Sequence, residues 1–425
     1  MRILFCSSGP YSGSGYGTQV YHLMKYFLSK SHDVALIATD FGKLIDFREE
    51  PYTLSEILKL KSFNIKPNLD LPEYPIYAIK NNLYGWDVMT NHALHFKADA
   101  VIFFRDPWKI LEIKENISIP AKLFAWIPID HQPASETLIK CVRVLPNLVS
   151  MSSFGQQELL LRGLKNNMIY HSIELDPEIE EYRSKNKLSL FKKKYKERLD
   201  LGQKSPVILL LLTNNQFPSR KAIDLNLEGV RKYIRSYPDA QIIIHSNMSG
   251  MHNGSKQGID MNFICQNLDF PPGSIYIPYG DKIVDRRQVL DLYATADILL
   301  HCSAGEGFGV PIIEAQYFGC SVITNNCTAM PEITYNGICI NENRRYYVNN
   351  VNSFWYYPSP ESICKALIQL STRTPLLNQR LQHDGSLFIK DYFNIQKIGD
   401  QWLDIIGKNK HSITDQITIS ISKKE

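Results

Sequence analysis

The sequence predicts an α/β fold built from two similar halves, each a parallel sheet covered by helices. Two observations carry this prediction. Short apolar runs, which are the expected strands, alternate along the chain with segments whose apolar residues have helical spacing. A charged stretch at about 176–205 interrupts the alternation, which then restarts at Val207.

The first half shows the pattern clearly. The run Arg2–Ser7 predicts a buried strand, and apolar residues between Val20 and Leu28 then follow at helical spacing. Asp33–Asp40, Ala100–Phe104 and Leu123–Ile127 predict further strands. Continuously apolar strands are typical of sheets buried on both faces, so these runs favour parallel βαβ units.

The second half repeats this alternation without repeating the sequence. Its predicted strands are Val207–Leu212, Gln241–His245, Ser274–Ile277, Asp297–Cys302 and Ser321–Thr324. Farther on, Phe388–Gly407 has the apolar spacing of one or two amphipathic helices. The tail Ile413–Glu425 fits either a strand or a disordered end.

These segments predict two Rossmann-like domains facing a central cleft, in which ligands bind beyond the strand ends. We expect a first domain at 1–185, a second at 186–395, and a C-terminal helix and tail at 396–425. The C-terminal helix is expected to cross back to the first domain.

Composition excludes several classes of protein. The chain has 425 residues and a net charge of only +4, which does not indicate a nucleic-acid partner. Its basic cluster, Lys192–Lys194 with Lys196 and Arg198, is expected to be the solvated face of a helix. No apolar run approaches the roughly 20 residues of a membrane span, and Ile3–Cys6 is too short for a signal peptide. We therefore expect a cytoplasmic protein.

The eight cysteines form no Cys-x-x-Cys pair, so we expect them to be reduced, and mostly buried. There is also no Asp-x-Asp, a common way of holding a divalent ion on a nucleotide diphosphate.

Three short segments could carry chemistry, and each has a plainer interpretation. The glycine loop Gly9–Gly17 follows a strand and opens a helix, which suits either a phosphate site or an ordinary turn. Asp130 and His131 follow another strand; they would steer a sugar hydroxyl or tune a proton, or Asp130 would cap the next helix. Arg220 and Lys221 would clamp a diphosphate or lie on an exposed basic loop.

The strongest signal is the segment 303–315, which follows the predicted strand Asp297–Cys302. Its glycines free backbone amides for an anion, and Pro311 suits the first turn of a helix. Seven residues separate Glu306 from Glu314, which places one carboxylate on the loop and one on the helix. Such a pair accepts hydrogen bonds from sugar or ribose hydroxyls without a metal. The plainer interpretation is a glycine turn with two surface glutamates.

This segment, Glu306-Gly-Phe-Gly-Val-Pro-x-x-Glu314-Ala, resembles the E-x7-E signature of retaining, nucleotide-sugar-dependent glycosyltransferases with the GT-B fold. It is most similar to family 4, the glycosyl transferases group 1. Asp297–Leu300, Thr328–Glu332 and Ser153–Leu159 agree with that family in order and spacing. The resemblance extends from Ile3 to about Ile406 and is most specific at 297–332.

The resemblance implies a role for each matching residue. His131, Asp130 and Glu306 would be catalytic, with His131 and Glu306 near the transferred sugar. One departure is Asn215, which stands where the family usually has an arginine that Arg220 would replace. The implied donor-binding residues are Gly15, Arg220 and Lys221 at the diphosphate, Tyr279 at the base, Phe308, Gly309 and Val310 through their backbone, and Glu314 at the ribose.

The function implied is a metal-independent, retaining transfer of a hexose from a UDP- or GDP-sugar, by same-face attack that the departing phosphate assists. The acceptor would be a glycan or another molecule with a free hydroxyl, lipid-linked and protein-linked acceptors included, bound by the first domain, and no cofactor or metal is expected. Asn215 leaves a non-catalytic nucleotide-sugar-binding protein as an alternative. A nicotinamide-dependent dehydrogenase, with Gly13–Thr18 as its dinucleotide loop, is a further alternative.

Overall fold

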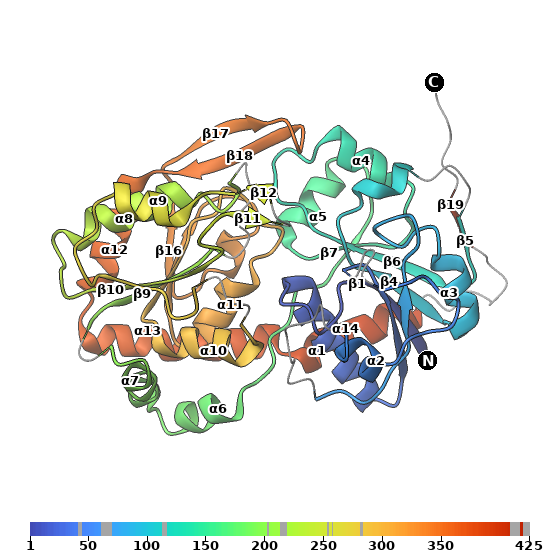
Figure 1. Cartoon of the computed structure of the whole chain (residues 1–425), viewed down its shortest axis with the longest axis horizontal. Helices are drawn as coiled ribbons and strands as arrows, with labels where there is room; N and C mark the ends of the chain where they lie inside the picture. Colours follow the sequence, from blue (N-terminus) through green and yellow to red (C-terminus); the bar gives the residue numbers. More distant parts are fainter. Residues whose placement is uncertain are drawn as a thin grey trace. The chain divides into compact units, whose positions relative to one another are not determined.

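The computed structural model describes two compact units (Figure 1). The first comprises Met1–Ile129, Pro133–Glu174 and Ile395–Glu425, and the second comprises Asp130–Gln132 and Leu175–Asn394. The residues described are 1–40, 45–60, 70–112, 117–201, 204–212, 219–252, 255–256, 258–280, 284–408 and 417–419.

The first unit contains a seven-stranded, entirely parallel sheet in the order β3-β2-β1-β4-β6-β7-β8. Strand β1 in its interior is buried from the second residue, as continuous apolar runs in parallel sheets are. A separate antiparallel pair joins β5 (Ile117–Ile119) to β19 (Ile417–Ile419), so part of the tail is a strand. The sheet strands are β1 (Arg2–Ser7), β2 (Asp33–Ala38), β3 (Ile76–Ala78), β4 (Ala100–Phe103), β6 (Lys122–Ile127), β7 (Leu148–Ser150) and β8 (Asn167–Met168).

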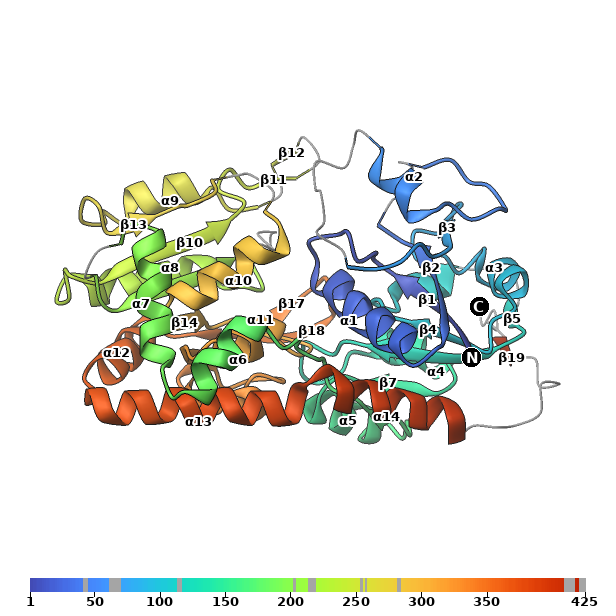
Figure 2. The ribbon, with the colours of Figure 1, turned by 90° about the horizontal axis from the view of Figure 1, so that it is seen from below.

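Helices cover both faces of this sheet (Figure 2). Phe5 of β1 stacks on Phe27 of α1 on one face, whereas Leu4 shares a core with Met89 of α3 on the other. The C-terminal helix α14 packs against α1, and its Trp402 is buried beside Trp126, as the expected return to the first domain requires. The helices are α1 (Gly15–Ser29), α2 (Leu54–Leu58), α3 (Met89–Phe96), the 3-10 helix η1 (Trp108–Glu112), α4 (Glu136–Arg143), α5 (Ser153–Leu160) and α14 (Ile395–Lys408).

The second unit contains a six-stranded parallel sheet in the order β13-β10-β9-β14-β15-β16. In both sheets the third, second, first and fourth strands follow one another, which is the doubly wound, Rossmann-like order. The predicted α/β fold with parallel sheets is therefore confirmed. The strands are β9 (Val207–Leu212), β10 (Gln241–Ser246), β13 (Ile275–Tyr276), β14 (Ile298–His301), β15 (Ser321–Asn325) and β16 (Gly337–Ile340).

Two helical layers enclose this second sheet. Helices α8 and α12 pack on each other in one layer, while α7, α10, α11 and α13 are in contact in the other. Two short antiparallel pairs, β11 with β12 and β17 with β18, lie outside the sheet. These elements are α6 (Pro177–Ser184), α7 (Leu188–Arg198), α8 (Ile223–Ile234), β11 (Met251–His252), β12 (Ser255–Lys256), α9 (Met261–Asn267), α10 (Arg286–Thr295), α11 (Val310–Tyr317), η2 (Pro331–Ile333), β17 (Asn343–Val348), β18 (Ser353–Pro358), α12 (Pro360–Ser371) and α13 (Pro375–Phe393).

The basic cluster on α7 is not the freely solvated face that the sequence predicted. Lys192 is buried and donates a hydrogen bond to the carbonyl of Ala296. Lys196 pairs with Asp297 at 2.6 Å, between their Nζ and Oδ2 atoms. Lys193 and Arg198 are exposed as predicted. The prediction was wrong for Lys192 and Lys196, which hold the helix to the segment just before β14, and sequence spacing alone does not reveal such partners.

All eight cysteines are free, and five of them are buried, as expected for reduced thiols. Within the described parts of the chain, we find no helix of the length and apolarity that crossing a membrane requires.

Candidate active site

The candidate site lies at the carboxyl ends of β9 and β14 in the second unit. These neighbouring strands lead to opposite edges of the sheet, because β9 is followed by β10 on one side and β14 by β15 on the other. Ligands of open α/β sheets bind at this topological switch point. The segment after β9 carries Arg220 and Lys221, and the loop after β14 carries Glu306.

Glu306 is surrounded by positively charged and hydrogen-bonding side chains. Its Oε1 atom accepts a hydrogen bond from Lys221 at 2.6 Å and lies 3.1 Å from Nε2 of His301. Its Oε2 atom accepts a bond from Nη1 of Arg220 at 2.7 Å. The backbone N–H of Glu306 donates to the Thr328 hydroxyl at 2.9 Å. The structure therefore brings the predicted phosphate clamp and the predicted sugar-facing carboxylate into one cluster.

Electrostatics keep this carboxylate ionised. Burial by itself would raise the pKa of Glu306, but the adjacent Arg220, Lys221 and His301 outweigh burial and hold that pKa well below its ordinary value. Burial lowers the pKa of Lys221, partly against the attraction of Glu306. Burial and nearby Lys221 likewise lower the pKa of His301. A carboxylate that stays charged at neutral pH accepts hydrogen bonds and does not act as a general acid.

Asp130 and His131 complete the cluster. Oδ1 of Asp130 lies 3.0 Å from Nδ1 of His131, and Oδ2 lies 3.4 Å from Nε of Arg220. Burial would raise the pKa of Asp130, but His131 and Arg220 lower it below the ordinary value. Asp130 does not cap α4, the plainer interpretation of this segment, because Ser135 is the N-cap.

Gly305 allows this arrangement. A Cβ atom built at Gly305 would lie 2.0 Å from the carbonyl oxygen of Asp130, much closer than two such atoms can approach. Arg220 also donates to the Gly305 carbonyl at 2.5 Å. Only glycine at this position lets the loop after β14 meet the Asp130–Gln132 segment.

The loop then turns into α11 through Gly309. This glycine has a φ of +107° and precedes Val310, the first residue of the helix. A side chain at Gly309 would be strained in this backbone conformation, and its Cβ would lie 2.8 Å from Ile312. Phe308 is buried, with its ring at a 6.0 Å centroid distance from that of Phe393. The predicted backbone contacts of these residues to a donor stay a prediction.

Glu314 occupies a different environment from Glu306. Its side chain is only 4% exposed, and both of its oxygens accept bonds from the guanidinium of Arg286 on α10, at 3.2 Å and 2.5 Å. Arg286 and Glu314 thus form a bidentate pair of hydrogen bonds, which is the geometry that arginine and carboxylate favour. Its predicted role at a ribose stays a prediction.

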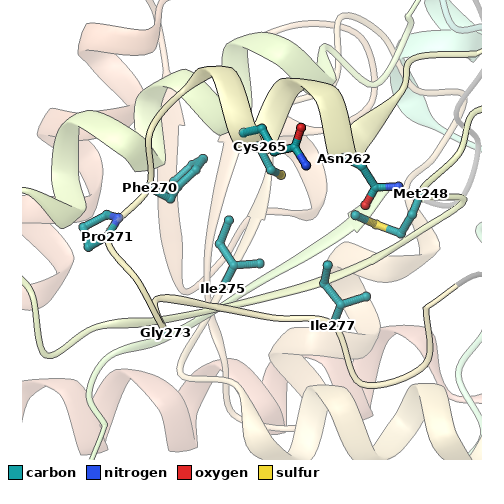
Figure 3. A pocket seen from close by; sticks show the side chains of 9 residues that line it. Met248, Asn262, Cys265, Phe270, Pro271, Gly273, Ile275 and Ile277 are labelled. Atoms are coloured by element: carbon teal, nitrogen blue, oxygen red, sulfur yellow. The ribbon is translucent and has the colours of Figure 1, made fainter.

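Tyr279 follows the edge strand β13. Its ring meets that of His245, at the end of β10, edge to face at a 6.1 Å centroid distance. Nearby, an open pocket of about 330 Å³ lies between α9 and β13 (Figure 3). Figure 3 shows Phe270, Ile275 and Ile277 among its lining residues, and Tyr279 is not one of them.

Two predicted positions remain: one lies in the first unit, and one falls outside the described residues. Gly15 is in the first unit, where it begins α1, and a Cβ built there would have no atom within 4 Å. Its predicted role at the diphosphate stays a prediction. Asn215 lies outside the described residues.

Sequence reasoning missed several residues of the cluster. His301 and Thr328 contact Glu306, and Arg286 pairs with Glu314. His301 carried a usable signal because it is the last residue of the strand that leads into the glycine loop. Arg286 carried none, because only the packing of α10 beside α11 brings it to Glu314.

Residues 282–378 match the family model described as Glycosyl transferases group 1. This segment includes Arg286, His301, Glu306 and Glu314, whereas Asp130, His131, Arg220 and Lys221 lie before it in the sequence. No match to a curated protein sequence was found.

Solved structures share the fold over 96% of this chain. A glycosyltransferase from Rickettsia africae ESF-5 is 17% identical, with a TM-score of 0.63 and 98% of its own chain covered. Sucrose-phosphate synthase from Thermosynechococcus elongatus is 12% identical, with a TM-score of 0.65 and 98% covered. Anabaena Alr3699/HepE, solved with UDP and glucose, is 14% identical, with a TM-score of 0.62 and 99% covered.

These structures place the chain's α/β fold, with its parallel sheets, among the GT-B glycosyltransferases. Together, the match over residues 282–378 and the shared fold indicate that the protein is a glycosyltransferase enzyme.

Proposed function

We propose that the protein transfers a hexose from a UDP- or GDP-sugar to a hydroxyl group of a glycan acceptor, with retention of anomeric configuration and without a metal ion. The observation that carries this proposal is the cluster of Arg220, Lys221 and Glu306 at the switch point of the second sheet. We also propose that the enzyme belongs with the family 4 glycosyltransferases.

The negative charge of the leaving group gives a reason for two cations, Arg220 and Lys221, at this site. When the sugar leaves a nucleotide diphosphate, negative charge accumulates on the departing phosphate. Arg220 and Lys221 now neutralise Glu306, and they are placed to exchange this carboxylate for phosphate oxygens when the donor binds. Such an exchange supplies the stabilisation that a divalent ion supplies in other transferases.

Glu306 and His131 are proposed to hold the sugar. The ionised Glu306 accepts hydrogen bonds from sugar hydroxyls once its cations turn to phosphate, while His301 stays on Oε1. Asp130 holds Nδ1 of His131 and so orients the ring toward one position. Each of these contacts limits the sugar to one pose relative to the diphosphate.

Retention is proposed to follow from attack on the face that the phosphate leaves. The bond between the anomeric carbon and the phosphate oxygen breaks, and the acceptor oxygen forms its bond to the same carbon. The acceptor proton passes to the departing phosphate oxygen, so no protein nucleophile is required. Arg220 and Lys221 hold that oxygen in place.

The structural likenesses support a hexose nucleotide as donor. Alr3699/HepE was solved with UDP-glucose, and two α,α-trehalose-phosphate synthases, one described as UDP-forming, are among the similar structures at 8% identity. Proteins of 8–14% identity share the fold with this chain. That this protein uses a hexose nucleotide as its donor is our proposal.

The test is donor turnover with chelator present. The full-length protein is incubated with UDP-, GDP- and ADP-sugars in EDTA, with and without a panel of glycan acceptors. Release of the nucleotide diphosphate is measured, and the anomeric configuration of the product is read by NMR. We expect release from one UDP- or GDP-hexose and a product with the donor's configuration.

The variant Glu306→Gln is expected to lose at least about tenfold in turnover, and Arg380→Ala, on the exposed face of α13, is the matched control.

Several outcomes contradict the proposal. Activity that disappears with EDTA contradicts metal independence, and an inverted product contradicts same-face attack. Tight donor binding without release, across the acceptor panel, identifies a non-catalytic nucleotide-sugar-binding protein instead.

A further inference from the structure

The sheet of the first unit has a topological switch point of its own. In the order β3-β2-β1-β4, the chain continues from β1 toward one edge of the sheet and from β4 toward the other. Ligands of open α/β sheets bind beyond the strand ends at such a point. Ser8 directly follows β1, and Arg105 comes two residues after the end of β4. The donor is proposed to bind at the switch point of the second unit, which leaves this one for the acceptor.

Arg105 is held in one orientation by three neighbours. Its Nη1 atom donates a hydrogen bond to the Ser8 hydroxyl at 2.7 Å, which joins the segments that follow the two strands. Its guanidinium carbon lies 5.3 Å from the ring centre of Tyr16, on α1, and 5.3 Å from that of Tyr84. Guanidinium groups are attracted to aromatic rings at this distance. The side chain is therefore ordered before a ligand arrives, which lowers the entropic cost of binding.

The two tyrosines are fixed in their turn. The ring of Tyr16 packs edge to face on that of Phe104 at a 4.8 Å centroid distance. The carbonyl of Tyr84 accepts a hydrogen bond from the thiol of Cys6, on β1, at 3.2 Å. The chain then turns at Gly85, whose φ of +73° favours glycine. Both tyrosines are half-buried, so they hold Arg105 without enclosing it.

The positive charge of Arg105 is not neutralised within the described part of the chain. There its side chain forms one hydrogen bond, to Ser8, and no ion pair. Its Nε atom is buried and lacks a hydrogen-bond partner among the same residues. A charged donor that is removed from water without an acceptor is costly, so the arginine favours an anion that brings acceptor oxygens.

The carboxylates in this part of the unit have other donors. Oδ2 of Asp40, which follows β2, accepts a hydrogen bond from the Gly9 N–H at 3.0 Å. Oδ2 of Asp106 accepts a hydrogen bond from the Tyr16 hydroxyl at 3.3 Å. Oδ2 of Asp87 accepts bonds from two backbone N–H groups, at 2.8 Å and 3.0 Å. These carboxylates therefore do not take the place of an anionic ligand on Arg105.

We propose that Arg105 binds an anionic group of the acceptor, either a phosphate or a carboxylate, and so selects an acidic saccharide over a neutral one. The inference rests on the proposed function, because it supplies the acceptor class of the same reaction. A guanidinium offers parallel N–H donors that match both anions. Space for a ligand exists beside the start of α1, since a Cβ built at Gly13 or Gly15 has no atom within 4 Å.

The experiment compares three sugars that differ at carbon 6, namely glucose, glucose 6-phosphate and glucuronate. Binding to the full-length protein is measured by saturation-transfer NMR at two salt concentrations, and transfer is measured from UDP- and GDP-hexoses. The test variants are Arg105→Gln, which removes the charge, and Arg105→Lys, which keeps the charge without the paired donors. The control is Arg143→Gln, an exposed arginine in the last turn of α4. UDP and GDP binding are measured on every protein by calorimetry.

We expect the wild type to bind at least one of the two anionic sugars about tenfold more tightly than glucose, and less tightly as salt is raised. Arg105→Gln should abolish this preference while glucose binding and nucleotide binding stay unchanged. Arg105→Lys should retain part of the preference, which a purely structural role for Arg105 would not predict. Arg143→Gln should behave as the wild type.

Equal binding of the three sugars by the wild type overturns the inference, and so does an unchanged preference in Arg105→Gln. A loss of UDP or GDP affinity in Arg105→Gln also overturns it, because Arg105 would then belong to the donor site. A preference for an anionic sugar that requires Arg105, without transfer from any nucleotide sugar, contradicts the proposed function and leaves the anion site standing.

Discussion

Lys221 donates a hydrogen bond to Oε1 of Glu306 at 2.6 Å, although the two residues lie in loops that follow different strands of the second sheet. Both side chains are largely buried, so the pair is held in a medium of low effective dielectric. A buried cation and carboxylate that neutralise each other are poised for exchange with an anionic ligand.

The first prediction concerns Lys221. Changing Lys221→Ala removes one of the two cations proposed to meet the diphosphate, so UDP or GDP affinity should fall by about tenfold to a hundredfold. Binding of the nucleoside, which lacks phosphates, should be unaffected. Calorimetry of both ligands checks this, with Lys232→Ala on the exposed face of α8 as control. Equal losses for nucleoside and diphosphate would place Lys221 outside the phosphate site.

The second prediction concerns Glu306 and pH. Its pKa is depressed in the folded state, so its ion pairs stabilise the fold fully above its ordinary pKa of 4.5 and lose that effect as pH falls through the folded-state pKa. Glu306→Gln should lower the free energy of unfolding by roughly 3 kcal/mol at pH 7. Urea denaturation should show this difference shrinking below about pH 4.5. A difference that stays constant from pH 7 to pH 3 would mean that the charge of Glu306 is not what stabilises the cluster.

The third prediction separates two roles of Glu314. If its carboxylate meets the ribose, wild-type protein should prefer UDP over 2′,3′-dideoxy-UDP, and Glu314→Gln should reduce that preference by about tenfold. Arg286→Met removes the partner of Glu314 but leaves the carboxylate, so it should keep the preference. Competition binding with the two nucleotides checks both variants. Identical behaviour of the two variants would show that Glu314 serves only its pair with Arg286.

The fourth prediction concerns Gly305. A methyl group there would meet the backbone carbonyl of Asp130 at 2.0 Å, and a backbone atom cannot move aside as a side chain can. Gly305→Ala should cost roughly 1–3 kcal/mol of unfolding free energy and displace His131, with a corresponding loss of turnover. Gly407→Ala, where a Cβ has no atom within 4 Å, is the control and should leave melting and turnover as they are. A stable, active Gly305→Ala protein would contradict the close approach of the two segments.

Much of the fold could be predicted from the spacing of apolar residues along the chain. The predicted strand Val207–Leu212 agrees with β9 residue for residue, because a short, continuous apolar run suits a strand of a sheet that is covered on both faces. The predicted helical segment Phe388–Gly407 covers the end of α13 and nearly all of α14, since its apolar residues recur with the helical period, whereas most of α13 was not predicted. The solvated basic face predicted on α7 was wrong for Lys192 and Lys196, because their partners lie more than a hundred residues away in the sequence.

What the sequence determined by itself is the alternation of buried strands and amphipathic helices, and the glycine-rich loop with Glu306 that follows the strand β14. These features depend on residues near one another in the chain. The spacing of apolar residues indicates helix or strand, and glycines mark where the backbone needs conformational freedom. Only the tertiary structure decided that Arg220 and Lys221 neutralise Glu306, that Asp130 joins them, and that Arg286 takes both oxygens of Glu314. Long-range ion pairs depend on how strand order and helix packing bring distant loops together, and no local pattern in the chain records that distance.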